Sequence, residues 1–191
     1  GPLSAATAIN PGVRAALDWI ASLPPHPGVQ RHLRLDSRTV RPGDVFVAVA
    51  GGTSDGRQHL GDAMKRGAAG ALVDADGWKG AAGSVPLRAV PHLRRQLGSL
   101  AAEYYGRPSE RLTSVGVTGT NGKTSCSQWI AQVLTREGRR CAVIGTVGIG
   151  FPGALEASDL TTPDPVSLQR EVRRLLDAGA QALAMEVSSI D

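Results

Sequence analysis

The sequence predicts an α/β protein made of two consecutive parts, and three observations support this. Apolar segments of strand length alternate with amphipathic segments of helix length along most of the chain. The segments at 141–145 and 182–187 are apolar almost without interruption, which is typical of parallel strands buried on both faces. A glycine-rich loop joins the strand expected at 114–118 to a helix. We therefore expect an N-terminal α/β domain over residues 1–111, followed by the first part of a parallel-sheet domain over 112–191.

The N-terminal part is expected to begin with a short amphipathic helix over residues 12–22, and the prolines at 24, 25 and 27 end it. A proline–glycine turn at 41–43 separates the first two strands, and glycines end the helices that follow. The expected strands are 33–38, 44–50, 70–74 and 85–90, the expected helices are 57–66 and 93–105, and 107–111 is a connector.

The second part alternates strand and helix. A three-stranded parallel sheet that lacks its next helix is a poor independent domain, so we expect the chain to be a fragment of a longer protein. The first helix is expected to carry Trp129, Ile130, Val133 and Leu134 on one face and to end at Gly138. The expected strands are 114–118, 141–145 and 182–187, and the expected helices are 124–137 and 165–178.

The composition of the 191 residues narrows the function classes. No apolar run approaches the ~20 residues that a membrane span needs, and no basic-then-apolar leader opens the chain. A net charge of +4 without charge runs is weak evidence for a polyanionic partner, and two Phe with two Tyr offer no stacking platform for nucleic acid. Cys126 and Cys141 lack metal-site spacing, and we expect both to be buried free thiols in a reducing compartment.

The loop after strand 114–118 has the composition of a phosphate-binding loop. Glycines let several backbone N–H groups turn inward toward an anion, and the helix N-terminus adds partial positive charge. A lysine there can reach the β- and γ-phosphates of a nucleoside triphosphate, and a threonine hydroxyl can ligate Mg²⁺. The spacing departs from the usual pattern, which would require glycine where the chain has Val117, so a glycine-rich turn with a chance Lys-Thr behind it is the alternative. The expected nucleotide-binding residues are Gly119, Thr120, Asn121, Gly122, Lys123, Thr124 and Ser125.

Two further groups of polar residues lie where ligands of parallel sheets collect, at the carboxyl ends of strands. Glu186 lies near the end of the strand expected at 182–187, where an acid can hold Mg²⁺ directly or through water; the alternative is a strand-end acid facing solvent. Thr161 and Thr162 precede a helix, and they offer hydroxyls to a ligand or simply cap that helix.

Four motifs occur in an order that resembles the Mur ligases of peptidoglycan synthesis, most closely the tripeptide-synthetase (MurE) branch of that family. They are G-T-N-G-K-T at 119–124, L-D-S-R at 35–38 with P-G-D-V-F-V-A at 42–48, T-T-P-D-P at 161–165 and M-E-V-S-S at 185–189. The resemblance covers residues 12–191 and implies a cytoplasmic ligase that uses ATP and Mg²⁺. Its substrates would be UDP-MurNAc-L-Ala-D-Glu and a diamino acid, meso-diaminopimelate or L-lysine, which react through an acyl phosphate.

The same resemblance implies roles for individual residues. Lys123 would stabilise the transferring phosphoryl group as a catalytic residue, and Thr124 and Glu186 would hold Mg²⁺, with Glu186 also catalytic. The implied contacts to the UDP-linked substrate are Leu35, Ser37, Gly52, Thr53, Ser54, Thr161, Thr162 and Ser188.

The chain also departs from the family pattern. Ile190 stands where a histidine is frequent, and Leu160 where some members have asparagine. The family's carbamoylated lysine and its amino-acid-binding domain lie downstream of residue 191, so we expect this chain alone to be inactive as a ligase. A different nucleotide-binding enzyme, such as a small-molecule kinase, and a non-catalytic module that binds a UDP-sugar precursor are the alternative functions.

Overall fold

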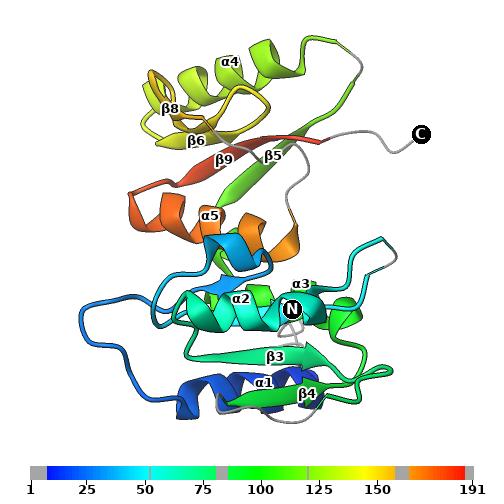
Figure 1. The fold of residues 1–191 in the computed structure, drawn as a ribbon. Helices are drawn as coiled ribbons and strands as arrows, with labels where there is room; N and C mark the ends of the chain where they lie inside the picture. Colours follow the sequence, from blue (N-terminus) through cyan, green and yellow to red (C-terminus); the bar gives the residue numbers. More distant parts are fainter. Residues whose placement is uncertain (1–7, 52, 81–85, 120, 158–163, 188–191) are drawn as a thin grey trace. The chain divides into compact units, whose positions relative to one another are not determined.

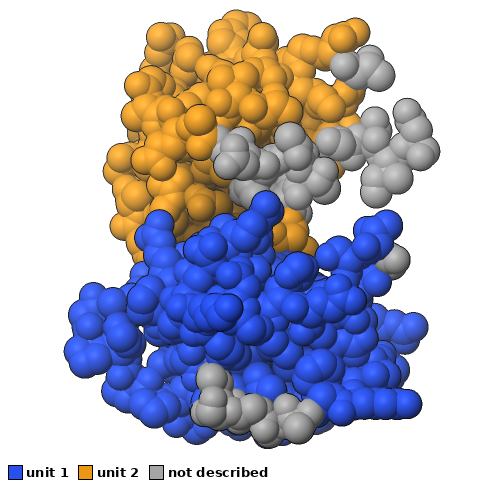
Figure 2. Space-filling model, viewed as in Figure 1, with its two compact units in different colours: residues 1–104 blue, residues 105–191 orange. Residues whose placement is uncertain are grey.

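The chain folds into two compact units, residues Gly1–Tyr104 and Tyr105–Asp191 (Figure 2). The computed structural model describes residues 8–51, 53–80, 86–119, 121–157 and 164–187. The sequence places the domain boundary after residue 111, whereas the 3₁₀ helix η3 (Pro108–Arg111) belongs to the second unit, where it packs against helix α5 (Pro165–Asp177).

The first unit is built on a four-stranded sheet in which every strand runs parallel to its neighbours (Figure 1). Phe46 and Ala71 point to the face covered by helix α2 (Leu60–Lys65), whereas the neighbouring Gly70 faces Trp19 of helix α1 (Pro11–Ser22) and its C-cap residue Leu23 on the other side. Helix α3 packs against α1 and β3. The elements are β1 (Leu33–Arg34), β2 (Val45–Ala48), β3 (Gly70–Asp74) and β4 (Leu87–Val90), with α1 (Pro11–Ser22), α2 (Leu60–Lys65) and α3 (Leu93–Tyr104).

The second unit holds a five-stranded sheet in the order β5-β9-β6-β7-β8, in which β5, β9 and β6 are parallel (Figure 1). Successive residues of β9, which lies between β5 and β6, face opposite sides, as the period of a strand requires: Ala184 packs on the side of helix α4, and Leu183 on the side of α5. The elements are β5 (Thr113–Val117), α4 (Lys123–Arg136), β6 (Cys141–Ile144), β7 (Ile149–Phe151), β8 (Ala154–Glu156), α5 and β9 (Ala182–Glu186).

Most expected elements are confirmed within one to three residues, and the differences have local causes. The strand expected at 33–38 ends at Arg34, because the Asp36 carboxylate accepts the backbone N–H of Arg38 and starts the 3₁₀ helix η1 (Ser37–Thr39). The helix expected at 57–66 is divided into the 3₁₀ helix η2 (Gly56–His59) and α2.

The hairpin formed by β7 and β8 is absent from the sequence-based expectation, so the expected three-stranded sheet is wrong in strand number. The hairpin pairs antiparallel with the edge of β6 and covers what would otherwise be a bare sheet edge. The Arg140 guanidinium lies over the ring of Phe151 in β7, 3.9 Å from its centroid, and fastens the hairpin to the segment that leads into β6.

The expected apolar face of α4 is also partly wrong. Ile130 and Leu134 pack against the sheet, but the side chains of Trp129 and Val133 are 73% and 49% exposed. Both cysteines are free thiols, as expected, although only Cys141 is buried.

This arrangement predicts opposite consequences for two large apolar side chains of the second unit. Leu183→Ala removes a side chain that is 2% exposed in the core and is expected to lower the free energy of unfolding by about 2–5 kcal/mol. Trp129→Ala on the exposed side of α4 is expected to change it by no more than about 0.5 kcal/mol. Urea unfolding followed by circular dichroism measures both, and a larger loss for Trp129→Ala would contradict the packing of α4.

Candidate nucleotide and substrate sites

The loop before α4 leaves the start of that helix open to an anion. Gly122 is the N-cap residue, in the left-handed conformation at φ 77°, and no side chain caps the helix. By contrast, Asn10 caps α1 and Asp164 caps α5 through their side-chain oxygens. The N-cap residue therefore offers no side-chain acceptor to the first N–H groups of α4, and Lys123, the first residue of the helix, adds a positive charge beside them. This geometry suits a phosphate group.

Glu186 lies at the carboxyl end of β9, the middle one of the three parallel strands, with the glycine-rich loop after β5 on one side and the end of β6 on the other. Its Oε2 accepts the backbone N–H of Thr146. Its Oε1 is buried and has no hydrogen-bond partner among the described residues. A buried carboxylate oxygen without a partner is costly unless a proton or a cation compensates it, so the residue fits the role of a Mg²⁺ ligand.

Thr146 connects Glu186 to the nucleotide loop. The Thr146 hydroxyl lies 3.3 Å from the hydroxyl of Thr124, the other expected Mg²⁺ ligand. Within the described parts of the chain, no group of three or more His, Cys, Asp or Glu residues could hold a metal by itself. One carboxylate and one hydroxyl are few ligands, which is the usual situation for Mg²⁺ held jointly by protein and phosphates.

The sequence reasoning missed Thr146 and its neighbour Gly145. Both directly follow β6, at the same sheet edge as the loop after β5 and the end of β9. The rule that ligands collect at the carboxyl ends of parallel strands, which singled out Glu186, applies equally to this turn. The sequence therefore contained evidence for this turn, because a small residue and a polar residue directly follow an apolar strand.

In the first unit, the expected substrate residues also follow the carboxyl ends of parallel strands. Leu35 and Ser37 come after β1, and Thr53 and Ser54 lie exposed in the loop after β2. The Ser37 side chain is only 6% exposed, and its interaction with the Asp62 carboxyl of α2 lowers the pKa of that carboxyl. Ser37 therefore also joins η1 to α2.

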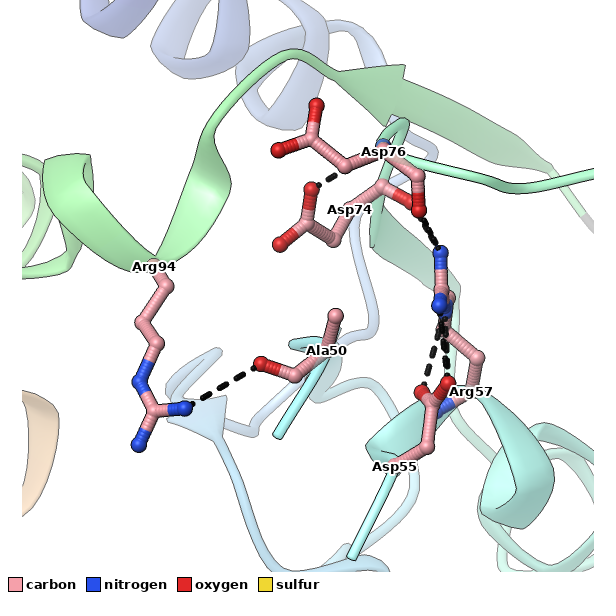
Figure 3. Close-up of polar contacts among 6 residues, drawn as sticks. All are labelled: Ala50, Asp55, Arg57, Asp74, Asp76 and Arg94. Carbon is pink, nitrogen blue, oxygen red and sulfur yellow. Dashed lines mark hydrogen bonds and ion pairs between the residues drawn. The ribbon is translucent and has the colours of Figure 1, made fainter. Parts of the chain in front are cut away.

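Two arginines hold the loop between β2 and η2 in place (Figure 3). Arg57 pairs with both oxygens of Asp55 and also donates to the backbone carbonyl oxygens of Asp74, the last residue of β3, and of Asp76 just after that strand. Arg94, in the first turn of α3, donates to the carbonyl oxygen of Ala50 at 3.4 Å. These contacts join the segments after β2, β3 and β4 into one polar edge.

Several other expected site residues lie outside the described part of the chain. They are Gly52, Thr120, Thr161, Thr162 and Ser188, and Leu160 and Ile190 lie outside it as well. Asn121 and Ser125 are described and are exposed next to the start of α4.

No helix in the described part of the chain has the length and apolar character to cross a membrane.

Comparison with known proteins agrees with the two-unit arrangement. The model described as "Mur ligase family, catalytic domain" matches residues 31–105, and the model of the Mur ligase middle domain matches residues 117–191. The chain belongs to the Mur ligase family.

Individual relatives cover most of this Mur ligase chain. A UDP-N-acetylmuramoyl-L-alanyl-D-glutamate–2,6-diaminopimelate ligase from Pseudomonas aeruginosa is 53% identical over 164 residues, which are 83% of this chain and 33% of the relative. A solved structure of a ligase with that name has a TM-score of 0.64 at 27% identity, covering 90% of this chain and 35% of its own. MurF from Thermotoga maritima in complex with ADP has a TM-score of 0.55 at 26% identity, with 83% and 32% covered. The chain thus spans about a third of the length of the curated relatives it matches.

The Arg57–Asp55 pair predicts a pH dependence of the stability of the first unit. Side-chain hydrogen bonds from Arg57, and then its backbone N–H, hold the pKa of Asp55 below its ordinary value. Because the folded pKa lies below the unfolded value of about 3.9, the pair stabilises the fold above that pH, and this contribution is lost as the pH falls through the folded pKa. Asp55→Asn is expected to lower the free energy of unfolding at pH 7, with the difference from wild type shrinking toward pH 3.

Urea unfolding at stepwise lower pH measures this difference. Asp18→Asn, at an exposed position of α1, is the matched control and is expected to show no comparable trend. A difference for Asp55→Asn that stayed constant with pH would contradict the assignment.

Proposed function

We propose that this chain forms the nucleotide-binding and UDP-substrate-binding parts of an ATP-dependent ligase of peptidoglycan precursor synthesis. The ligase would add a diamino acid to UDP-MurNAc-L-Ala-D-Glu. The names of relatives such as the Pseudomonas aeruginosa enzyme favour 2,6-diaminopimelate over L-lysine as that amino acid. ATP and UDP-linked precursors are cytoplasmic metabolites, so we place the reaction in the cytoplasm.

The observation that carries the proposal is the open N-terminus of α4 beside an unpartnered carboxylate oxygen. Lys123 and the first N–H groups of α4 form a place for the phosphates, and Glu186 Oε1 and the Thr124 hydroxyl are the oxygens available to a cation. The ADP bound by the Thermotoga maritima neighbour supports an adenine nucleotide as the occupant.

The proposed chemistry needs charge neutralisation and positioning more than covalent catalysis by the protein. The D-Glu carboxylate of the precursor attacks the γ-phosphorus of ATP, the bond from that phosphorus to the bridging oxygen breaks, and ADP leaves. The diamino acid's amine then attacks the acyl phosphate carbonyl, loses a proton and expels inorganic phosphate. Lys123 is placed to offset negative charge on the transferring group, and bound Mg²⁺ would supply further charge neutralisation at the phosphates.

The UDP end of the precursor is assigned to the polar edge of the first unit. Thr53 and Ser54 are exposed there, in a loop whose base is fixed by Arg57 and Arg94. Exposed hydroxyls and backbone N–H groups on a fixed loop suit a diphosphate. The half-buried Leu35 after β1 offers an apolar contact for a uracil ring at the same edge.

The proposal predicts that the two ligands can be lost independently. Lys123→Ala is expected to weaken ATP·Mg²⁺ binding about tenfold or more, because a charge-assisted contact to phosphate is removed, and to leave UDP-MurNAc-L-Ala-D-Glu binding unchanged. Ser37→Ala is expected to show the opposite pattern. Calorimetric titration with each ligand separately measures both, with Lys79→Ala, which changes an exposed lysine, as the control.

Thermal unfolding of each variant shows whether a loss of binding follows a loss of folding, which matters for Ser37 because its hydroxyl contacts Asp62. If a folded Lys123→Ala variant lost affinity for both ligands equally, the assignment of the two sites to two units would be wrong. ATP binding without affinity for UDP compounds would favour a different nucleotide-binding enzyme, and UDP-precursor binding without ATP binding would favour a non-catalytic binding module.

A further inference from the structure

The turn between β6 and β7 brings an exposed hydroxyl into the nucleotide site. The backbone groups of Gly145 and Gly148 hydrogen-bond to each other in both directions, at 3.1 and 3.2 Å, and close a tight turn. Thr146 lies within this turn and is exposed, so the fold does not require its side chain for packing. Its hydroxyl nevertheless lies 3.3 Å from that of Thr124 in the first turn of α4.

The same turn fixes the carboxylate of Glu186. The backbone N–H of Thr146 donates to Oε2, which leaves Oε1 as the oxygen that is buried and unpartnered. The carboxylate approaches the turn so closely that a Cβ on Gly145 would lie 2.7 Å from its Cδ, nearer than real Cβ atoms come to other atoms. The carboxylate of Glu186 can therefore occupy this position only because residue 145 is a glycine.

The hydroxyl pair has a chemical consequence if Thr124 ligates a cation. A hydroxyl that gives a lone pair to a cation points its O–H bond away from that positive charge, and its proton is then free to be donated to an acceptor. The Thr146 oxygen is in hydrogen-bonding reach of that proton. Thr146 would thus orient both expected ligands, Glu186 through its backbone N–H and Thr124 through its hydroxyl.

We propose that Thr146 is a positioning residue of the ATP·Mg²⁺ site, which orients the Thr124 hydroxyl and the Glu186 carboxylate toward the cation. This inference rests on the proposed function, because it needs the nucleotide site to bind Mg²⁺ with ATP. It adds a residue from the β6–β7 turn to a site otherwise made of the loop before α4 and the end of β9.

The test compares variants that keep or remove the hydroxyl at constant shape. Thr146→Val is expected to weaken binding of the non-hydrolysable analogue AMP-PNP in the presence of Mg²⁺ about three- to tenfold, the usual effect of one lost hydrogen bond. Its affinity for AMP-PNP in EDTA is expected to stay the same, because without the cation the Thr124 hydroxyl needs no fixed orientation. Thr146→Ser keeps the hydroxyl and is expected to restore Mg²⁺-dependent binding to within about twofold. Val147→Ala, in the same turn, is the control for a change of turn structure.

A second variant tests the carboxylate's position. Gly145→Ala is expected to leave the melting temperature nearly unchanged, since the side chain of Glu186 can move away, but to reduce the Mg²⁺ dependence of AMP-PNP binding more than Thr146→Val does. The inference is overturned if wild type binds AMP-PNP·Mg²⁺ and Thr146→Val binds it equally well, or if Thr146→Val weakens binding equally in EDTA. If wild type binds no nucleotide in either condition, the proposed function itself is overturned, and the role of Thr146 with it.

Discussion

Parallel strand pairing is the constraint on which both sites depend. In the first unit all four strands, and in the second unit β5, β9 and β6, run in one direction. Every loop that leaves the carboxyl end of such a strand emerges at the same edge of its sheet. Segments far apart in the sequence, such as the loop before α4, Thr146 and Glu186, therefore lie close together because of the strand pairing. The backbone pairing determines the position of these polar groups, and the side-chain types determine which ligands they can bind.

A polar sheet edge has to be held in place by groups that are themselves satisfied. Asp44, which is 1% exposed, illustrates this at the start of β2. Its carboxylate accepts the backbone N–H groups of His32 and Arg41 and pairs with Arg34 at 3.1 Å. A buried charge with this many partners costs little, and it joins β1 to β2. Asp44 belongs to the P-G-D motif that identifies the family, so part of that motif serves the fold and not the ligand.

The sequence was sufficient for features with strong local determinants. The strands at 70–74 and 182–187 and the helices at 93–105, 124–137 and 165–178 follow from apolar periodicity, glycine and capping residues within a few positions. It was insufficient where tertiary contacts decide. The hairpin of β7 and β8 has three residues in each strand, too few for a clear period, and it forms because the edge of β6 is available for pairing. The exposure of Trp129 also contradicts its hydrophobicity, since small residues such as Ala131 occupy the contact of α4 with the sheet.

In the candidate site, too, the sequence predicts some features and tertiary contacts decide others, and Glu186 is an example of both. The sequence places an acid at the end of β9, but it does not indicate which of the two carboxylate oxygens accepts a hydrogen bond. Among the described residues, the buried side-chain oxygens without a partner belong to Gln96, Gln169 and Glu186, and only that of Glu186 belongs to a carboxylate. A neutral amide oxygen can remain unpaired at a modest cost, whereas an unpaired buried carboxylate oxygen costs more because it carries charge. A glycine at 145 and the backbone N–H of Thr146 hold this carboxylate close to the turn, and its other oxygen is the one that we propose as a cation ligand. The contacts of Glu186 with the turn after β6 would then serve to hold that oxygen in place for the cation.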